Sequence, residues 1–166
     1  WALASGKTAP VEMLPLPVVT AFGTNKPGPK FDGTYEFIDG DEAIKLMTLA
    51  PGLKANRFAS EKQFPELAKA LQMNFDTKGR LWVAVWPSYP ERTPTSKIAD
   101  KIIILEDTDK DGRADKCTVF LDGLNCPTGF QFFKDGILLM QAPDVWFVRD
   151  TDGDGKGDWK ERVLMG

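Results

Sequence analysis

The amino-acid sequence predicts an all-β fold: a partial β-propeller of about two to three four-stranded blades, with an extended N-terminal arm and one short helix. Three observations lead to this prediction. Short segments after residue 53 alternate apolar with polar residues, glycine-containing turns join pairs of them, and two Asp-rich loops begin 43 residues apart, at 107 and 150. That displacement falls within the ~40–50 residues of one four-stranded blade.

The composition is that of one soluble globular unit. The 166 residues are 42% hydrophobic and 27% charged, and the net charge of -3 offers no broad positive surface for nucleic acid. The longest apolar run in a predicted strand, 102–105, is far shorter than the ~18–20 residues that span a bilayer, so no membrane span is expected. Histidine is absent, which excludes Ser-His-Asp and Cys-His pairs and His-ligated metals within the chain. The sequence therefore indicates no catalytic residue.

The N-terminal part divides into an arm and a helix. Residues 1–40 contain many prolines and no sustained period, which predicts an extended arm or linker before the β-rich segment 41–166. Asp41 precedes the helix formers 42–47 and can cap a short helix that ends before Pro51. The first residue is Trp rather than Met, and removal of a secretory signal is one explanation. We therefore expect an exported protein, periplasmic or extracellular.

The predicted strands form two similar series after a first strand at 53–59. In each series, a hairpin precedes an apolar strand, an Asp-rich loop and a further strand, and glycine allows positive φ in each hairpin turn. The Pro- and Ser-rich segment 86–99 has no counterpart in the second series and is expected to form an inserted loop. The strands of the first series are 71–75, 80–85, 101–105 and 116–120, and those of the second are 128–133, 137–141, 145–148 and 162–165.

The Asp-rich loops 107–115 and 150–158 have the ligand spacing of calcium loops. A hard cation needs six to eight oxygens at ~2.3–2.6 Å, which alternate carboxylates of a tightly curled loop supply, and glycine at position 6 allows the sharp turn. Many protein oxygens favour calcium over magnesium, which tends to keep its waters. Predicted ligands at loop positions 1, 3, 5, 7 (by its carbonyl) and 9 are Asp107, Asp109, Asp111, Arg113 and Asp115, and Asp150, Asp152, Asp154, Lys156 and Asp158.

Position 12 distinguishes the two loops. Glu161 stands there in the second loop and can bind a cation through both oxygens, whereas the first loop has Thr118. We therefore expect Glu161 to be a further ligand and the second loop to bind calcium more tightly. Solvated turns that bind no metal also use Asp and Gly, because Asp accepts from backbone amides.

Other residues leave alternatives open. Cys117 and Cys126 can form a disulfide or remain two thiols. Trp82 and Trp146 alternate with apolar residues, which favours core packing. Trp86 and Tyr89 fit equally well in the core or on a platform that binds a sugar or a cofactor.

The chain resembles a known family in an ordered series of motifs. These are Gly79-Arg80-Leu81-Trp82-Val83-Ala84-Val85-Trp86-Pro87, the segment from Asp100 to Asp109, the segment from Asp111 to Phe120, and Pro127-Thr128-Gly129-Phe130. Over about residues 41–166 it is similar to the N-terminal propeller of large secreted proteins of planctomycetes and verrucomicrobia, described as membrane-bound dehydrogenases or haem-binding proteins.

This resemblance implies a propeller similar to sugar dehydrogenases that use pyrroloquinoline quinone, commonly followed by helical repeats and a c-type cytochrome module. Haem c or pyrroloquinoline quinone would bind in other parts of such a protein, because the His-bearing segments are absent from this chain. We expect a calcium-stabilised, non-catalytic segment of an exported, redox-associated protein, packed against further polypeptide or a partner subunit. The alternative is a calcium-dependent module that binds carbohydrate or protein.

Overall fold

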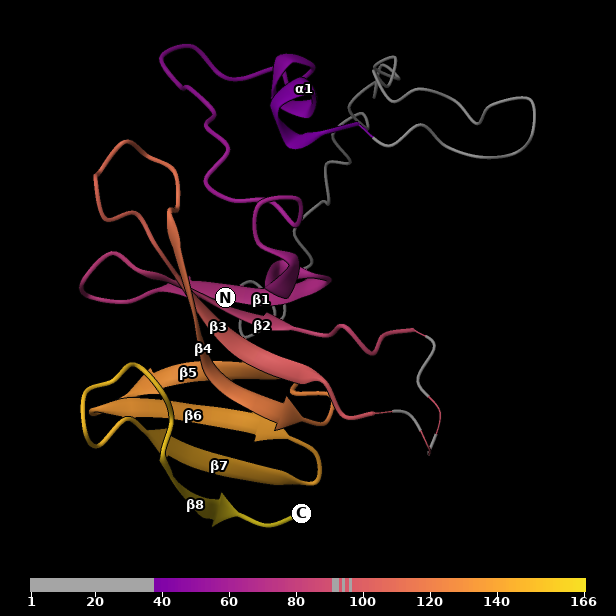
Figure 1. The fold of residues 1–166 in the computed structure, drawn as a ribbon, viewed down its shortest axis with the longest axis vertical. Helices are drawn as coiled ribbons and strands as arrows, with labels where there is room; N and C mark the ends of the chain where they lie inside the picture. Colours follow the sequence, from indigo (N-terminus) through magenta and orange to yellow (C-terminus); the bar gives the residue numbers. More distant parts are fainter. Residues whose placement is uncertain (1–37, 91–92, 94, 96) are drawn as a thin grey trace, which may run out of the picture. The chain divides into compact units, whose positions relative to one another are not determined.

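The computed structural model describes residues 38–90, 93, 95 and 97–166. Most of the predicted arm 1–40 lies outside the described residues. The described part is mostly β, with two four-stranded antiparallel sheets and one short α-helix (Figure 1). Its elements are α1 (Gly40–Lys45), the 3-10 turn η1 (Pro65–Leu67), β1 (Ala70–Phe75), β2 (Leu81–Val85), β3 (Asp100–Glu106), β4 (Lys116–Leu124), β5 (Gly129–Phe133), β6 (Gly136–Gln141), β7 (Asp144–Arg149) and β8 (Trp159–Leu164).

Each sheet is built from strands that pair in the order of the sequence. The first has the order β1-β2-β3-β4 and the second β5-β6-β7-β8, so every connection within a sheet joins antiparallel neighbours. Both predicted hairpins are present. Gly79 has φ +77° in the β1–β2 turn, as expected, whereas in the β5–β6 turn Lys134 has positive φ, at 49°.

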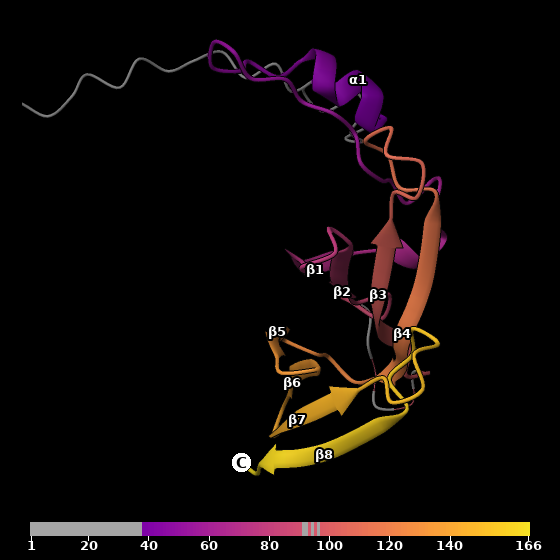
Figure 2. The ribbon, with the colours of Figure 1, turned by 90° about the vertical axis from the view of Figure 1, so that its left-hand side faces the viewer.

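The main core lies between the two sheets. Trp82 of β2 packs against Phe120 of β4, with ring centroids 4.6 Å apart, and against Phe130 of β5 at 6.4 Å. Figure 2 shows the two sheets as successive layers, with the β7–β8 loop beside β4. Trp82 is buried and Trp146 packs partly buried against the same cluster, so both tryptophans are core residues.

A second core cluster covers the opposite face of the first sheet. Val83, Val85, Ile103 and Leu105 are fully buried there, beneath partly buried hydrophobic residues of the segment 58–67. The stretch 53–59 forms no ladder with any described strand, so the predicted strand there is wrong. Its one strand-like contact is the bond from the Ala114 N–H to the Phe58 carbonyl, 2.8 Å.

Three further details differ from the sequence-based expectations or resolve them. The helix cap is Asp39, whose carboxylate accepts from the Asp41 N–H at 3.4 Å, because the helix begins one residue before Asp41. The last strand starts at Trp159 instead of residue 162. Cys117 and Cys126 are not joined by a disulfide. Among the described residues, no helix is both long and apolar enough to cross a membrane.

Candidate metal centres

The two Asp-rich loops occupy the same place in their sheets. Each connects the third strand to the fourth, and each is closed by a backbone bond at its ninth residue. The Asp115 N–H donates to the Glu106 carbonyl at 2.9 Å, and the Asp158 N–H donates to the Arg149 carbonyl at 3.0 Å. The loops are therefore wide hairpin connections with matched ends.

Inside the loops, the first carboxylate organises the turn. Asp107 accepts from the Gly112 N–H at 2.9 Å, and Asp150 accepts from the Gly155 N–H at the same distance. In both loops the fourth and sixth residues have positive φ, which Gly112 and Gly155 adopt without steric cost at the sixth position. Sequence placement of glycine thus fixes the curl that turns the carboxylates inward.

The ninth carboxylate is held by the second residue of each loop. Asp115 accepts from the N–H and the hydroxyl of Thr108, at 3.1 and 2.6 Å. Asp158 accepts from the same groups of Thr151, at 2.9 and 2.6 Å. In each case the threonine hydroxyl bond is the main cause of a pKa below the usual range for that carboxyl, so both groups are charged at neutral pH.

Three carboxylates converge in each loop. One oxygen from each of Asp107, Asp109 and Asp115 lies within 4.8 Å of the others. The second loop brings together Asp150, Asp152 and Asp154 in the same way. Such all-oxygen groups suit a hard cation, and the predominance of charged donors suits calcium. The two sets differ because position 9 joins the group in the first loop and position 5 in the second.

Other predicted ligands lie outside these groups. Asp111 accepts from the Arg113 N–H at 2.7 Å, and Asp158 lies across the loop on Thr151. The carbonyl ligands expected at Arg113 and Lys156 stay predictions. Their side chains contact carboxylates, Arg113 that of Asp41 at 3.5 Å and Lys156 that of Asp154 at 3.7 Å.

Glu161 does not join the carboxylate group of the second loop. It lies on β8 opposite Phe147, three residues beyond Asp158, and an extended strand advances ~3.3 Å per residue away from the loop. In an EF-hand, a helix follows the loop and returns position 12 to the cation. The ligand role expected of Glu161, and the tighter binding expected of the second loop, stay predictions.

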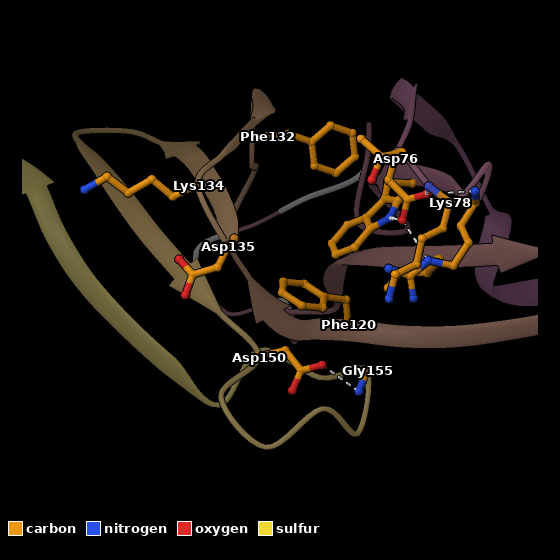
Figure 3. Close-up of a pocket in the computed structure, with 13 residues that line it drawn as sticks. Asp76, Lys78, Phe120, Phe132, Lys134, Asp135, Asp150 and Gly155 are labelled. Atoms are coloured by element: carbon orange, nitrogen blue, oxygen red, sulfur yellow. Dashed lines mark hydrogen bonds and ion pairs between the residues drawn. The ribbon is translucent and has the colours of Figure 1, made fainter.

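A cavity of about 370 Å³ lies between the sheets beside the second loop (Figure 3). Trp82 and Phe120 form part of its wall, and the cationic side chains of Lys78 and Lys134 stand at its edge with Asp150. Asp76 accepts here from the Trp82 indole at 3.0 Å and from the Arg80 guanidinium at 2.7 Å. The cavity thus combines an aromatic wall with charges of both signs.

A second hollow corresponds to the aromatic pair that the sequence left open. Trp86 and Tyr89 have ring centroids 5.9 Å apart and line it with Leu71 and Lys69. The Trp86 indole donates to the Pro127 carbonyl at 2.7 Å, which fixes one ring, while Tyr89 is exposed. One ring is therefore anchored and the other is accessible.

Sequence reasoning missed two carboxylates that hold loops in place, the buried Asp100 and the half-buried Asp76. Asp100 is 1% exposed and accepts from the Ser88 hydroxyl at 2.6 Å and the Cys126 N–H at 2.8 Å. Asp76 accepts hydrogen bonds from donors in its own hairpin. The Asp-Thr-Lys-Gly turn was a usable signal for Asp76, whereas Asp100 pairs with residues far away in sequence.

The sequence comparison assigns a family to this fold. Residues 39–166 match the domain of unknown function DUF7133. The chain belongs to this family. The DUF7133 match begins at the helix cap and includes both sheets and both Asp-rich loops. No curated protein and no solved structure matches the chain.

Proposed function

We propose that this DUF7133 segment is a calcium-stabilised part of a β-propeller, with its two sheets as successive blades. The observation that carries the proposal is the repetition of one loop geometry at two places 43 residues apart. Each loop brings three carboxylates together where its sheet meets a further stretch of chain, at Phe58 for the first loop and at Phe120 of β4 for the second. A bound cation there would offset the mutual repulsion of these carboxylates.

The proposed role of calcium is structural. The carboxylates lie at strand connections, and their remaining hydrogen bonds go to the backbone of the same loop. Calcium would hold the curled loop and thereby the strands on both sides. The parent protein, in this proposal, is exported and redox-associated, packed against further polypeptide or a cytochrome c module, with this segment non-catalytic. The motif resemblance described above supports that part.

Isothermal titration calorimetry tests the metal proposal. We expect two calcium ions per chain, and one each for Asp107→Asn and Asp150→Asn, because each substitution removes a carboxylate from one group. Asp122→Asn is the matched control, since Asp122 is an exposed acidic residue of β4 outside the loops. Absence of calcium binding to the unmodified chain would refute the proposal, as would equal occupancy by magnesium.

The redox association needs a separate measurement on the protein from its natural source. A haem Soret band or quinone absorbance that copurifies with the chain would support it. Purified material with neither spectrum would contradict it, even if calcium binds.

The hollow at Trp86 and Tyr89 favours a second candidate, a calcium-dependent module that binds carbohydrate. An anchored indole beside an exposed phenol is suited to stacking on the apolar face of a sugar ring. Glycan binding that disappears in Tyr89→Ala and in chelator would support this candidate. Binding that Tyr89→Ala leaves unchanged would place the glycan elsewhere.

A further inference from the structure

Each Asp-rich loop makes the same contact with a segment outside its own sheet. The donor is the N–H of the eighth loop residue. Ala114 donates to the Phe58 carbonyl at 2.8 Å, and Gly157 donates to the Phe120 carbonyl at 2.7 Å. Two loops thus dock in one manner on two unrelated stretches of chain.

The sixth residue of each loop also lies close to the same outside segment. A Cβ atom on Gly112 would lie 2.7 Å from the Asn56 amide nitrogen, and one on Gly155 would lie 3.5 Å from the Thr118 methyl carbon. Asn56 and Thr118 each stand two residues before the phenylalanine that accepts the bond. Each loop therefore lies along a three-residue stretch, 56–58 for the first loop and 118–120 for the second.

The last strand, β8, contains the corresponding stretch of the second sheet. Loops of equal length precede β4 and β8 and end at Asp115 and Asp158, so Thr118 and Phe120 correspond to Glu161 and Val163. Phe120 is 3% exposed beneath the second sheet, whereas Val163 is 43% exposed. The stretches 56–58 and 118–120 are each covered by an Asp-rich loop. The corresponding stretch 161–163 is exposed.

The surface around Val163 is apolar and faces away from the first sheet. Lys160 and Arg162 lie over the Trp146 ring, which packs against the core between the sheets. The ladder shifts register at Val163, whose counterpart Phe120, at the same shift in β4, faces the following sheet. Because side chains alternate along a strand, Trp159 and Glu161 lie on the face opposite to Lys160 and Arg162. Trp159 is 38% exposed there, and its ring contacts Phe147 at 5.9 Å. A large apolar surface exposed to water is unfavourable and is typical of a site that binds another protein segment.

We propose that residues 161–163 of β8 form the docking surface for a further β-sheet that carries an Asp-rich loop of the same kind. The N–H of that loop's eighth residue would donate to the Val163 carbonyl. The eighth residue must be small, since a Cβ on Gly157 would already lie 3.1 Å from the Phe120 ring. A second copy of the described residues cannot provide this loop, because both of its loops are docked within their own chain.

This inference deepens the proposed blade arrangement and rests on it, but it does not depend on calcium. The donor and the acceptor are both backbone groups. It also gives Glu161 a different place from the metal ligand expected from its spacing. The side chain of Glu161 would lie beside the sixth residue of the incoming loop, as Asn56 and Thr118 do in the existing contacts.

An extended chain tests the docking surface. Gly166 corresponds to Gly123, so a second copy of residues 124–166 appended after Gly166 continues the repeat in register. Hydrogen exchange then reports on the glycine of the appended loop that corresponds to Gly157. We expect its amide to exchange at least ~100-fold more slowly than an unprotected amide. Fast exchange at this glycine, with Gly157 still protected, would overturn the inference.

Val163→Asp provides the matched variant. In the 166-residue chain Val163 is partly exposed, so we expect the unfolding midpoint to change by less than ~2 °C. In the extended chain the same substitution should lower the midpoint by more than ~4 °C and remove the protection of the appended glycine. Equal shifts in both chains would overturn the inference. Measuring exchange in calcium and in chelator separates docking from metal binding, since docking can persist where the calcium response is absent.

Discussion

The first and second sheets share strand order and loop geometry but differ in what covers them. The first sheet is covered on both faces, by the segment 58–67 and by the second sheet. Of the described residues, only those of the first sheet cover the second. Ala84 and Met140 occupy corresponding positions on β2 and β6, yet Ala84 is 0% and Met140 53% exposed. The local sequence determines where the strands form, whereas the segments packed on each sheet determine how far its side chains are buried.

The largest expected difference concerns Phe120 and Val163, which correspond in position. Phe120→Ala removes a buried ring that packs against Trp82, and we expect a loss of about 3–5 kcal/mol in the free energy of unfolding. Val163→Ala removes a partly exposed side chain, and we expect less than about 1 kcal/mol. Urea unfolding measures both losses. Similar losses at the two positions would show that the sheets are equally covered.

The eighth residues of the loops give the next comparison. Gly157→Ala would place a Cβ 2.7 Å from Val148 and 3.1 Å from the Phe120 ring, and we expect overpacking to cost about 1–3 kcal/mol. Ala114, its counterpart, already has a Cβ and is buried. Ala114→Gly should therefore destabilise by about 1 kcal/mol through backbone entropy and lost packing. A neutral Gly157→Ala would mean that the second loop does not rest closely on β4.

The hairpin turns differ in how they hold their carboxylates. Burial raises the pKa of Asp76, but hydrogen bonds from Arg80, Trp82 and Lys78 outweigh burial and lower it below the usual range. Asp135, by contrast, is exposed and pairs with Arg149 at 3.0 Å. We expect Asp76→Asn to cost about 1–3 kcal/mol and Asp135→Asn less than about 1 kcal/mol in the free energy of unfolding.

Asp76 should also contribute to the pH dependence of stability. Because its folded pKa is below its unfolded value, its stabilisation is present above about pH 4 and is lost as the pH falls through the folded pKa. Asp76→Asn should therefore flatten the acid limb of the stability curve measured by urea unfolding. If the variant lost stability at low pH as the unmodified chain does, carboxyl groups other than Asp76 would cause the pH dependence.

The smallest expected effect tests the ligand role that its spacing predicts for Glu161. Because β8 carries Glu161 away from the loop, Glu161→Gln should change the calcium dissociation constant of the second loop by less than about twofold. Asp154→Asn should weaken binding by at least about tenfold, since Asp154 belongs to the converging group. Calorimetry compares the two variants directly. A tenfold loss for Glu161→Gln would support the sequence-based ranking of the loops and contradict this expectation.

The sequence predicted the features that depend on short-range chemistry. Alternation and turn glycines located both hairpins, and the Asp spacing located two loops in which the first carboxylate accepts from the sixth N–H. Prediction from the sequence failed where the contacting residues lie far apart in the chain. The segment 53–59 has strand-like alternation, but its backbone meets the Asp-rich loop instead of a pairing strand. The ligand role of Glu161 stays a prediction, because it rests on an EF-hand spacing and the chain continues there as a strand.

Thermal unfolding in calcium and in chelator tests the central claim most directly, namely that calcium binds the folded loops and stabilises them. A ligand that binds only the folded chain stabilises it by RT ln(1 + [L]/Kd), about 2.7 kcal/mol per site at 100 times Kd. We predict a higher midpoint in calcium than in chelator, with no such difference in an Asp107→Asn, Asp150→Asn double variant. An unmodified chain with the same midpoint in both conditions would contradict the claim.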